Sequence, residues 1–136
     1  SNWVSTGTSQ HLRGRRSRST APELKLRRAL HAVGFRFRLH PSLARGCNPD
    51  LVLPRYRTAV WVDGCFWHGH GHQGEPAGPN SDLWRRKIQA NQERDIRAIR
   101  LARNLGWRAI RIWECEINAN VGQVLGRIRG LIELPD

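Results

Sequence analysis

The 136-residue sequence has no long apolar run and little negative charge. No stretch approaches the roughly 18 apolar residues that a membrane-spanning helix needs, and we expect no secretory signal peptide. Eleven acidic residues stand against 23 Lys and Arg, for a formal net charge of +12. Such a chain is expected to bind a polyanion, and with DNA the driving force is counterion release from phosphates. A ribosomal or membrane-surface protein is the alternative, although the arginines are scattered rather than gathered on one amphipathic helix.

Cysteine is also scarce, with only Cys47, Cys65 and Cys115. An odd number argues against a disulfide framework and favours reduced thiols in a cytoplasm. The length suits one domain with a single core, which we place at residues 20–136. Residues 1–19 carry Gly, Ser and Arg without an apolar period, so they are predicted to be a flexible basic arm along a phosphate backbone or a disordered tail.

Local patterns predict the order α-β-β-β-α-β-α, an α/β fold with a central sheet flanked by helices. Thr20 followed by Pro and Glu23 is typical of a helix N-terminus. The apolar run at 58–62 predicts a central strand, joined to strand 51–53 by a hairpin turn. Helix 82–105 carries arginines on one face and apolar residues such as Leu83 and Ile96 on the other. The helix that follows the N-cap Thr20 is predicted at 21–33, ended by Gly34, and the remaining elements at 35–39 and 107–113 (strands) and 121–134 (helix).

Two acids stand at the ends of the paired strands, Asp50 before the first and Asp63 after the second. Neighbouring strands lie about 4.8 Å apart, so these side chains can converge on one ion. Oxygen ligands suit Mg²⁺, which activates water and neutralises charge on a phosphodiester. His68 titrates near neutral pH and is a candidate general base. The alternatives are that both acids are turn or capping residues and that His68 is an ordinary surface residue.

Four further residues match a tetrahedral zinc site of two sulfurs and two nitrogens: Cys65, His70, His72 and Cys115. Because Cys115 follows the strand 107–113, such an ion would pin the irregular loop after residue 63 to the sheet. The spacing is not that of a zinc finger, and the alternative is two small buried cysteines with exposed histidines. Cys47 has no such neighbours and is interpreted as a structural thiol.

Aromatic residues accompany these groups. Phe66 and Trp67 lie on the Gly-flanked loop, where they serve either as its hydrophobic plug or as a wedge that enters a base stack. Trp84, near the start of the basic helix, poses the same alternative. The tryptophans within predicted strands are assigned to the core: Trp61, Trp107 and Trp113.

Together these residues resemble the very-short-patch repair (Vsr) family of DNA mismatch endonucleases. The matching segments follow the family's order from about residue 12 to 116: 20–24 (TAPEL), 48–52 (NPDLV), 62–68 (VDGCFWH), 84–91 (WxxKIxxN), 93–95 (ERD), 105–107 (LGW) and 113–115 (WEC). The segment DGCFWH is specific enough that chance agreement is not expected.

The resemblance implies a restriction-endonuclease-like core that nicks double-stranded DNA, with Mg²⁺, beside a T:G mismatch. Such mismatches arise when 5-methylcytosine deaminates, and the expected products are a 5′-phosphate and a 3′-hydroxyl. In the family, the acid at the position of Asp50 binds Mg²⁺ together with the backbone carbonyl at Val62. The positions of Glu23 and Asp63 belong to the active site, and that of His68 is the general base or acid. For Glu23 this competes with, or adds to, the capping role.

The resemblance also implies that Phe66, Trp67 and Trp84 intercalate beside the mismatch, which favours the wedge. There are departures from related patterns. Residues 62–64 (VDG) stand where a typical restriction-type core has an acid, any residue and Lys, and His72 replaces the Cys of some members. We expect a monomer, since a nick needs one active site, in the cytoplasm and nucleoid of a bacterium. The alternatives are a homing, restriction or phage-defence nuclease with the same site, or a non-catalytic zinc-stabilised DNA-binding module.

Overall fold

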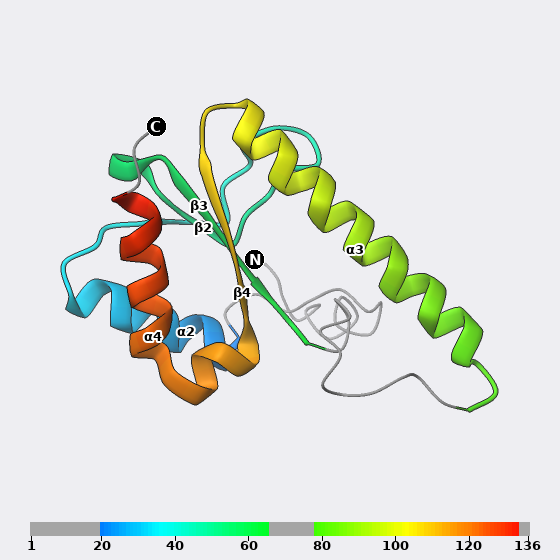
Figure 1. Cartoon of the computed structure of the whole chain (residues 1–136). Coiled ribbons are helices and arrows are strands. Elements are labelled where there is room, and N and C mark those ends of the chain that lie inside the picture. Colours follow the sequence, from blue (N-terminus) through cyan, green and yellow to red (C-terminus); the bar gives the residue numbers. More distant parts are fainter. Residues whose placement is uncertain (1–19, 66–77, 134–136) are drawn as a thin grey trace, which may run out of the picture.

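The structure is a computed structural model that describes residues 20–65 and 78–133 (Figure 1). The predicted order of helices and strands is confirmed over these residues. The elements are α2 (Ala21–Ala32), β1 (Arg38–Leu39), β2 (Leu51–Leu53), the 3₁₀ turn η1 (Pro54–Tyr56), β3 (Thr58–Asp63), α3 (Ser81–Asn104), β4 (Arg108–Trp113) and α4 (Glu114–Ile132).

The four strands form one mixed sheet in the order β1-β2-β3-β4. The pairs β1–β2 and β2–β3 are antiparallel, with Leu51 opposite Val60, while β3 and β4 are parallel, with Val62 opposite Ile112. Parallel neighbours need a long crossover, and α3 lies in the connection between β3 and β4. All six residues of β3 are buried, as predicted for a central strand.

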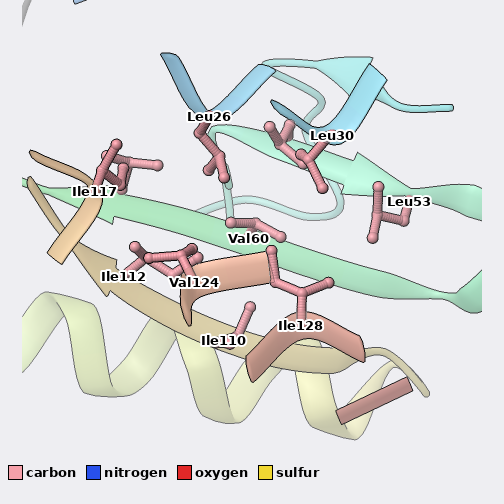
Figure 2. Packing of buried hydrophobic residues seen from close by; sticks show 11 residues of the cluster. Leu26, Leu30, Leu53, Val60, Ile110, Ile112, Ile117, Val124 and Ile128 are labelled. Carbon is pink, nitrogen blue, oxygen red and sulfur yellow. The ribbon is translucent and has the colours of Figure 1, made fainter. Parts of the chain in front are cut away.

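Helices α2 and α4 cover one face of the sheet and α3 covers the other (Figure 1). Side chains alternate along a strand, so Val60 and Val62 face the first layer and Ala59 and Trp61 the second. Figure 2 shows the larger cluster, where branched side chains of the sheet meet those of both helices. Its buried members are Leu26, Leu30, Leu51, Leu53, Val60, Val62, Ile110, Ile112, Ile117, Val124 and Ile128.

Helix α3 contacts the sheet through small residues. Ala98 and Ala102 are its buried positions and pack in the cluster that contains Trp61. The predicted apolar stripe is therefore wrong in part, because Leu83 is 56% exposed and Ile96 48% exposed. Leu83 lies in the N-terminal part of α3, which extends beyond the sheet (Figure 1). Ile96 lies only two residues before the buried Ala98, which places it on the opposite face of the helix. None of the helices in the described ranges is long and apolar enough to cross a membrane.

Two element boundaries differ from the predictions. The first strand is shorter than 35–39, because Phe35 and Phe37 pack against the core cluster without pairing with β2. The last helix begins at Glu114 rather than 121. Asn120 interrupts it with φ −166° and ψ 92°, and its Oδ1 accepts a hydrogen bond from the N–H of Gln123 at 3.2 Å. Asn120 thus caps a second helical segment, which starts where the sequence predicted the helix.

Candidate functional site

Three polar side chains converge at one end of the β1–β2 hairpin. Glu23 lies in the first turn of α2, His40 directly follows β1, and Asp50 directly precedes β2. One ligand atom from each lies within 4.8 Å of the others. Glu23 is 2% exposed, Asp50 is 3% exposed and His40 is half-buried. Two buried carboxylates and an imidazole at this separation fit a single divalent cation.

Backbone hydrogen bonds place Asp50 between two strands. Its Oδ2 accepts a hydrogen bond from the N–H of Val62 at 2.6 Å, and its own N–H donates to the carbonyl of Val60 at 2.9 Å. The N–H of His40 donates to the carbonyl of Asp50 at 2.8 Å. His40 has a φ of 47°, a left-handed conformation that is uncommon for residues other than Gly, although Asn, Asp and His adopt it more often than the rest. The end of the hairpin is therefore ordered around Asp50.

Glu23 lies both in the capped first turn of α2 and in the three-residue cluster, so the two roles that the sequence left open both stay predictions. Its N–H donates to Oγ1 of Thr20 at 3.4 Å, which confirms Thr20 as the N-cap of α2. Its carboxylate lies in the three-residue cluster, where Oε2 is 3.4 Å from Nη2 of Arg27. The same Nη2 lies 3.2 Å from Nε2 of His40. A guanidinium thus stands beside two of the three groups.

Asp63 has a different partner. It is 3% exposed at the end of β3, and Nε of Arg111 on β4 forms an ion pair with its Oδ2. Nη2 of Arg111 also donates to Oδ2 of Asp95 on α3 at 2.7 Å, and its guanidinium lies 4.4 Å from the ring centre of Trp113. This network joins β3, β4 and α3. That Asp63 shares an ion with Asp50, or acts in catalysis, stays a prediction.

Cys65 and Cys115 come together, as the zinc hypothesis requires. The pKa of the Cys115 thiol is raised by burial and by a hydrogen bond and charge interaction with Cys65. Cys65 follows β3 and Cys115 lies in the first turn of α4, so the parallel pairing of β3 and β4 brings them together. Two adjacent thiols fit half of a tetrahedral zinc site. The other two predicted ligands, His70 and His72, lie outside the described residues.

Phe66, Trp67 and His68 also lie outside the described residues. Trp84 is half-buried near the start of α3, with Nζ of Lys87 5.5 Å from its ring centre.

Of the three tryptophans assigned to the core, Trp61 is buried at 8% exposure, as predicted. Trp107 and Trp113 are only half-buried, and their rings are covered by the guanidinium groups of Arg57 and Arg111. Trp107, directly before β4, packs against the cluster that contains Trp61, so its core assignment is confirmed in part. Trp113 is the last residue of β4, outside the buried middle of the strand, which explains why the core assignment fails for it.

Sequence reasoning missed His40 and Arg27. A lone His in a loop carries no motif, and its position depends on the pairing of β1 with β2. Arg27 had a readable signal, since it lies four residues after Glu23, a spacing that brings opposite charges together on one helix face.

A mixed sheet flanked by helices, with buried carboxylates at strand ends on a strongly basic chain, is consistent with a nuclease core. The family model described as "DNA mismatch endonuclease Vsr" matches residues 5–73. The "Type II nicking enzyme V.XorIIP" of Xanthomonas oryzae pv. oryzae is 40% identical over 119 residues, covering 87% of this chain and 86% of that protein. The "DNA mismatch endonuclease Vsr" of Escherichia coli is 36% identical over 110 residues, covering 80% of this chain and 70% of that protein.

These similarities define the class of the protein as a DNA endonuclease. The chain belongs to the Vsr family, which confirms the resemblance drawn from its motifs.

Proposed function

We propose that this endonuclease nicks one strand of double-stranded DNA beside a T:G mismatch, acts as a monomer, and uses Mg²⁺ or a related divalent cation. The observation that carries the proposal is the cluster of Glu23, His40 and Asp50, whose ligand atoms lie within 4.8 Å of one another. Mg²⁺ sites in nucleic-acid enzymes use a few carboxylates and complete the coordination with water and substrate phosphate. When bound, the cation would polarise the scissile phosphate and lower the pKa of the attacking water.

The chain's own residues would orient these reactants. Asp50 is held against β3 by the N–H of Val62, so its carboxylate needs little reordering when a cation binds. The carbonyl of Val62 is proposed as a further ligand. His68 is proposed to take the proton of the attacking water, and Asp63 to assist at the active site.

Mismatch selection is proposed to depend on Phe66, Trp67 and Trp84 as a wedge. A T:G pair is paired more weakly than a matched pair, so opening the stack there costs less. The placement of Trp84 supports this, because the N-terminal part of α3 extends beyond the sheet (Figure 1). Exposed Arg85 and Arg86 follow it and would neutralise phosphates of an approaching duplex.

A structural zinc ion is proposed on Cys65, His70, His72 and Cys115. The contact between the two thiols supports it, because half of the donor set is already together. By joining the start of α4 to the segment after β3, the ion would fix the loop that carries the proposed wedge and His68.

The test is a nicking assay on a labelled duplex with one T:G pair and on the same duplex with C:G, in Mg²⁺ and in EDTA. We expect Mg²⁺-dependent nicking of the T:G duplex alone. Asp50→Asn and Glu23→Gln should each slow it on the order of 100-fold. Glu133→Gln is the matched control, because this acid is exposed at the end of α4 and belongs to none of the proposed sites. Cleavage without a divalent cation, or full activity of both site variants, contradicts the proposal.

A second candidate is a homing, restriction or phage-defence nuclease with the same active site, and several relatives are named "Type II nicking enzyme", a name that states nicking and no mismatch. Equal rates on the T:G and C:G duplexes would select it. The alternative of a non-catalytic DNA-binding module is wrong, since the family consists of endonucleases.

A further inference from the structure

His40 changes the chemistry of the acidic cluster. Mg²⁺ takes oxygen ligands almost exclusively, whereas imidazole is a typical ligand of first-row transition ions. In this site one nitrogen lies within 4.8 Å of a carboxylate oxygen from each of Glu23 and Asp50. The donor set is therefore two oxygens and one nitrogen rather than oxygen alone.

Arg27 reveals which atom of the imidazole carries the lone pair. A guanidinium only donates hydrogen bonds. Nη2 of Arg27 lies 3.2 Å from Nε2 of His40, so a hydrogen bond between them makes Nε2 the acceptor and assigns the ring proton to Nδ1. Nε2 is thus the only ring nitrogen with a lone pair for a metal, and Arg27 donates to it.

Arg27 also offsets negative charge in the site. Its Nη2 lies 3.4 Å from Oε2 of Glu23, and its side chain is only 13% exposed. Buried carboxylates are costly without a compensating cation, so the guanidinium stabilises the cluster before a metal arrives. A divalent cation and a guanidinium beside the same acceptors repel each other strongly at low dielectric. The two cations therefore compete.

We propose that His40 is a metal ligand through Nε2, that Arg27 is the internal cation which the metal displaces from it, and that the nitrogen donor makes the site hold Mn²⁺ more tightly than Mg²⁺. This inference rests on the proposed use of a divalent cation at Glu23 and Asp50. It adds a ligand, a competitor and a cation preference to that site.

Calorimetric titration of the full chain with Mn²⁺ or Mg²⁺, without DNA, tests the proposal. One equivalent of Zn²⁺ is added first, so that thiols do not compete. We expect wild-type protein to bind Mn²⁺ at least about tenfold more tightly than Mg²⁺. His40→Asn should remove most of that preference, while Asn accepts the left-handed backbone of this position. Arg27→Gln should tighten Mn²⁺ binding several-fold, because the competing charge is gone.

Two exposed residues of α2 supply the matched controls. His31→Asn removes an exposed imidazole, and Arg28→Gln removes an exposed charge one residue from Arg27. Both should leave the two affinities unchanged. Thermal melts verify folding, and electron spin-echo spectroscopy of bound Mn²⁺ detects nitrogen coupling directly. That coupling should vanish in His40→Asn and persist in His31→Asn.

An unchanged Mn²⁺/Mg²⁺ ratio and nitrogen coupling in folded His40→Asn overturn the role of His40. Weaker Mn²⁺ binding in Arg27→Gln overturns the competition. These failures are distinguishable from failure of the proposed function, which is the absence of divalent-dependent nicking by wild-type protein. An enzyme that nicks with Mg²⁺ but shows no effect of His40 keeps the proposed function and loses only the inference.

Discussion

The N–H of Val62 donates to Oδ2 of Asp50 at 2.6 Å, joining a buried carboxylate to the central strand. Both residues lie at the end of the antiparallel pair β2–β3, where Asp50 precedes the first strand and Val62 is near the end of the second. The bond gives Asp50 a structural role besides the proposed chemical one. The two roles can be separated by choosing the substitution.

Asp50→Asn and Asp50→Ala should therefore differ in stability and agree in activity. Asn keeps an oxygen for the N–H of Val62, whereas Ala leaves that buried donor unsatisfied, at a cost of about 1–3 kcal/mol. Urea unfolding measures the difference, and the nicking assay should show both variants to be strongly impaired. Equal unfolding midpoints for the two variants would show that the bond to Val62 contributes little.

Arg111→Met should destabilise the protein more than the loss of an exposed ion pair would, because Arg111 is half-buried between β3 and α3. The substitution leaves Asp63, which is 3% exposed, without its partner on β4. Removing one member of a buried ion pair costs about 3–5 kcal/mol. The double variant Asp63→Asn/Arg111→Met should recover part of that loss, and a double-mutant cycle by urea unfolding checks it. Strictly additive losses would mean that the two side chains are not coupled.

Asn120→Ala should destabilise the second segment of α4 by about 1 kcal/mol, the usual cost of losing an N-cap. The lost bond is the one from the N–H of Gln123 to Oδ1 of Asn120. The matched control is Asn118→Ala, an exposed position two residues earlier in the first helical segment. Asn118→Ala should be neutral or slightly stabilising. Differential scanning calorimetry measures both melting temperatures, and a lower value for Asn118→Ala than for Asn120→Ala would contradict the capping role.

The free energy of unfolding should fall at alkaline pH because of the buried Cys47 thiol. Burial raises the pKa of its thiol above the ordinary value of 9.0, and Sγ donates to the carbonyl of Ala98 at 3.4 Å. The unfolded chain then loses this proton at a lower pH than the folded protein does. The contribution of the Cys47 thiol to the free energy of unfolding is thus fully present below pH 9, and it is lost as the pH rises through the pKa of this thiol in the folded protein. Cys47→Ala should differ less from wild type at pH 10 than at pH 7.5 in urea unfolding.

Zinc content separates the cysteines by role. Purified wild-type protein should carry about one equivalent of Zn²⁺ by elemental analysis, and Cys115→Ser should lose most of it. Cys47→Ser is the control, since that thiol lies in the cluster with Trp61 and Ala98, away from the thiol pair. A wild-type chain without zinc after metal-replete expression would contradict the proposed site.

Local patterns predicted most elements of the fold. Alternation, capping residues and apolar runs depend on neighbours in the chain, so α2, the hairpin of β2 and β3, and β4 were foreseen. The failures came where tertiary contacts decide the outcome. Leu83 and Ile96 match a buried helical stripe, yet α3 packs through Ala98 and Ala102, so Leu83 lies at its projecting N-terminal end and Ile96 on its outer face.

For the site, the sequence alone identified the family motifs and predicted Asp50 and Glu23 as active-site acids and Cys65 and Cys115 as ligands of one zinc ion. The structure brings each of these pairs together, while their roles stay predictions. These residues lie in short sequence motifs, and the carboxylate and thiol groups in a motif limit the metals and reactions it can serve. Only the tertiary structure placed His40 and Arg27 beside the two carboxylates and showed that Asp63 forms an ion pair with Arg111. Partners that come from separate elements are set by strand register and helix docking, and neither is encoded in local spacing.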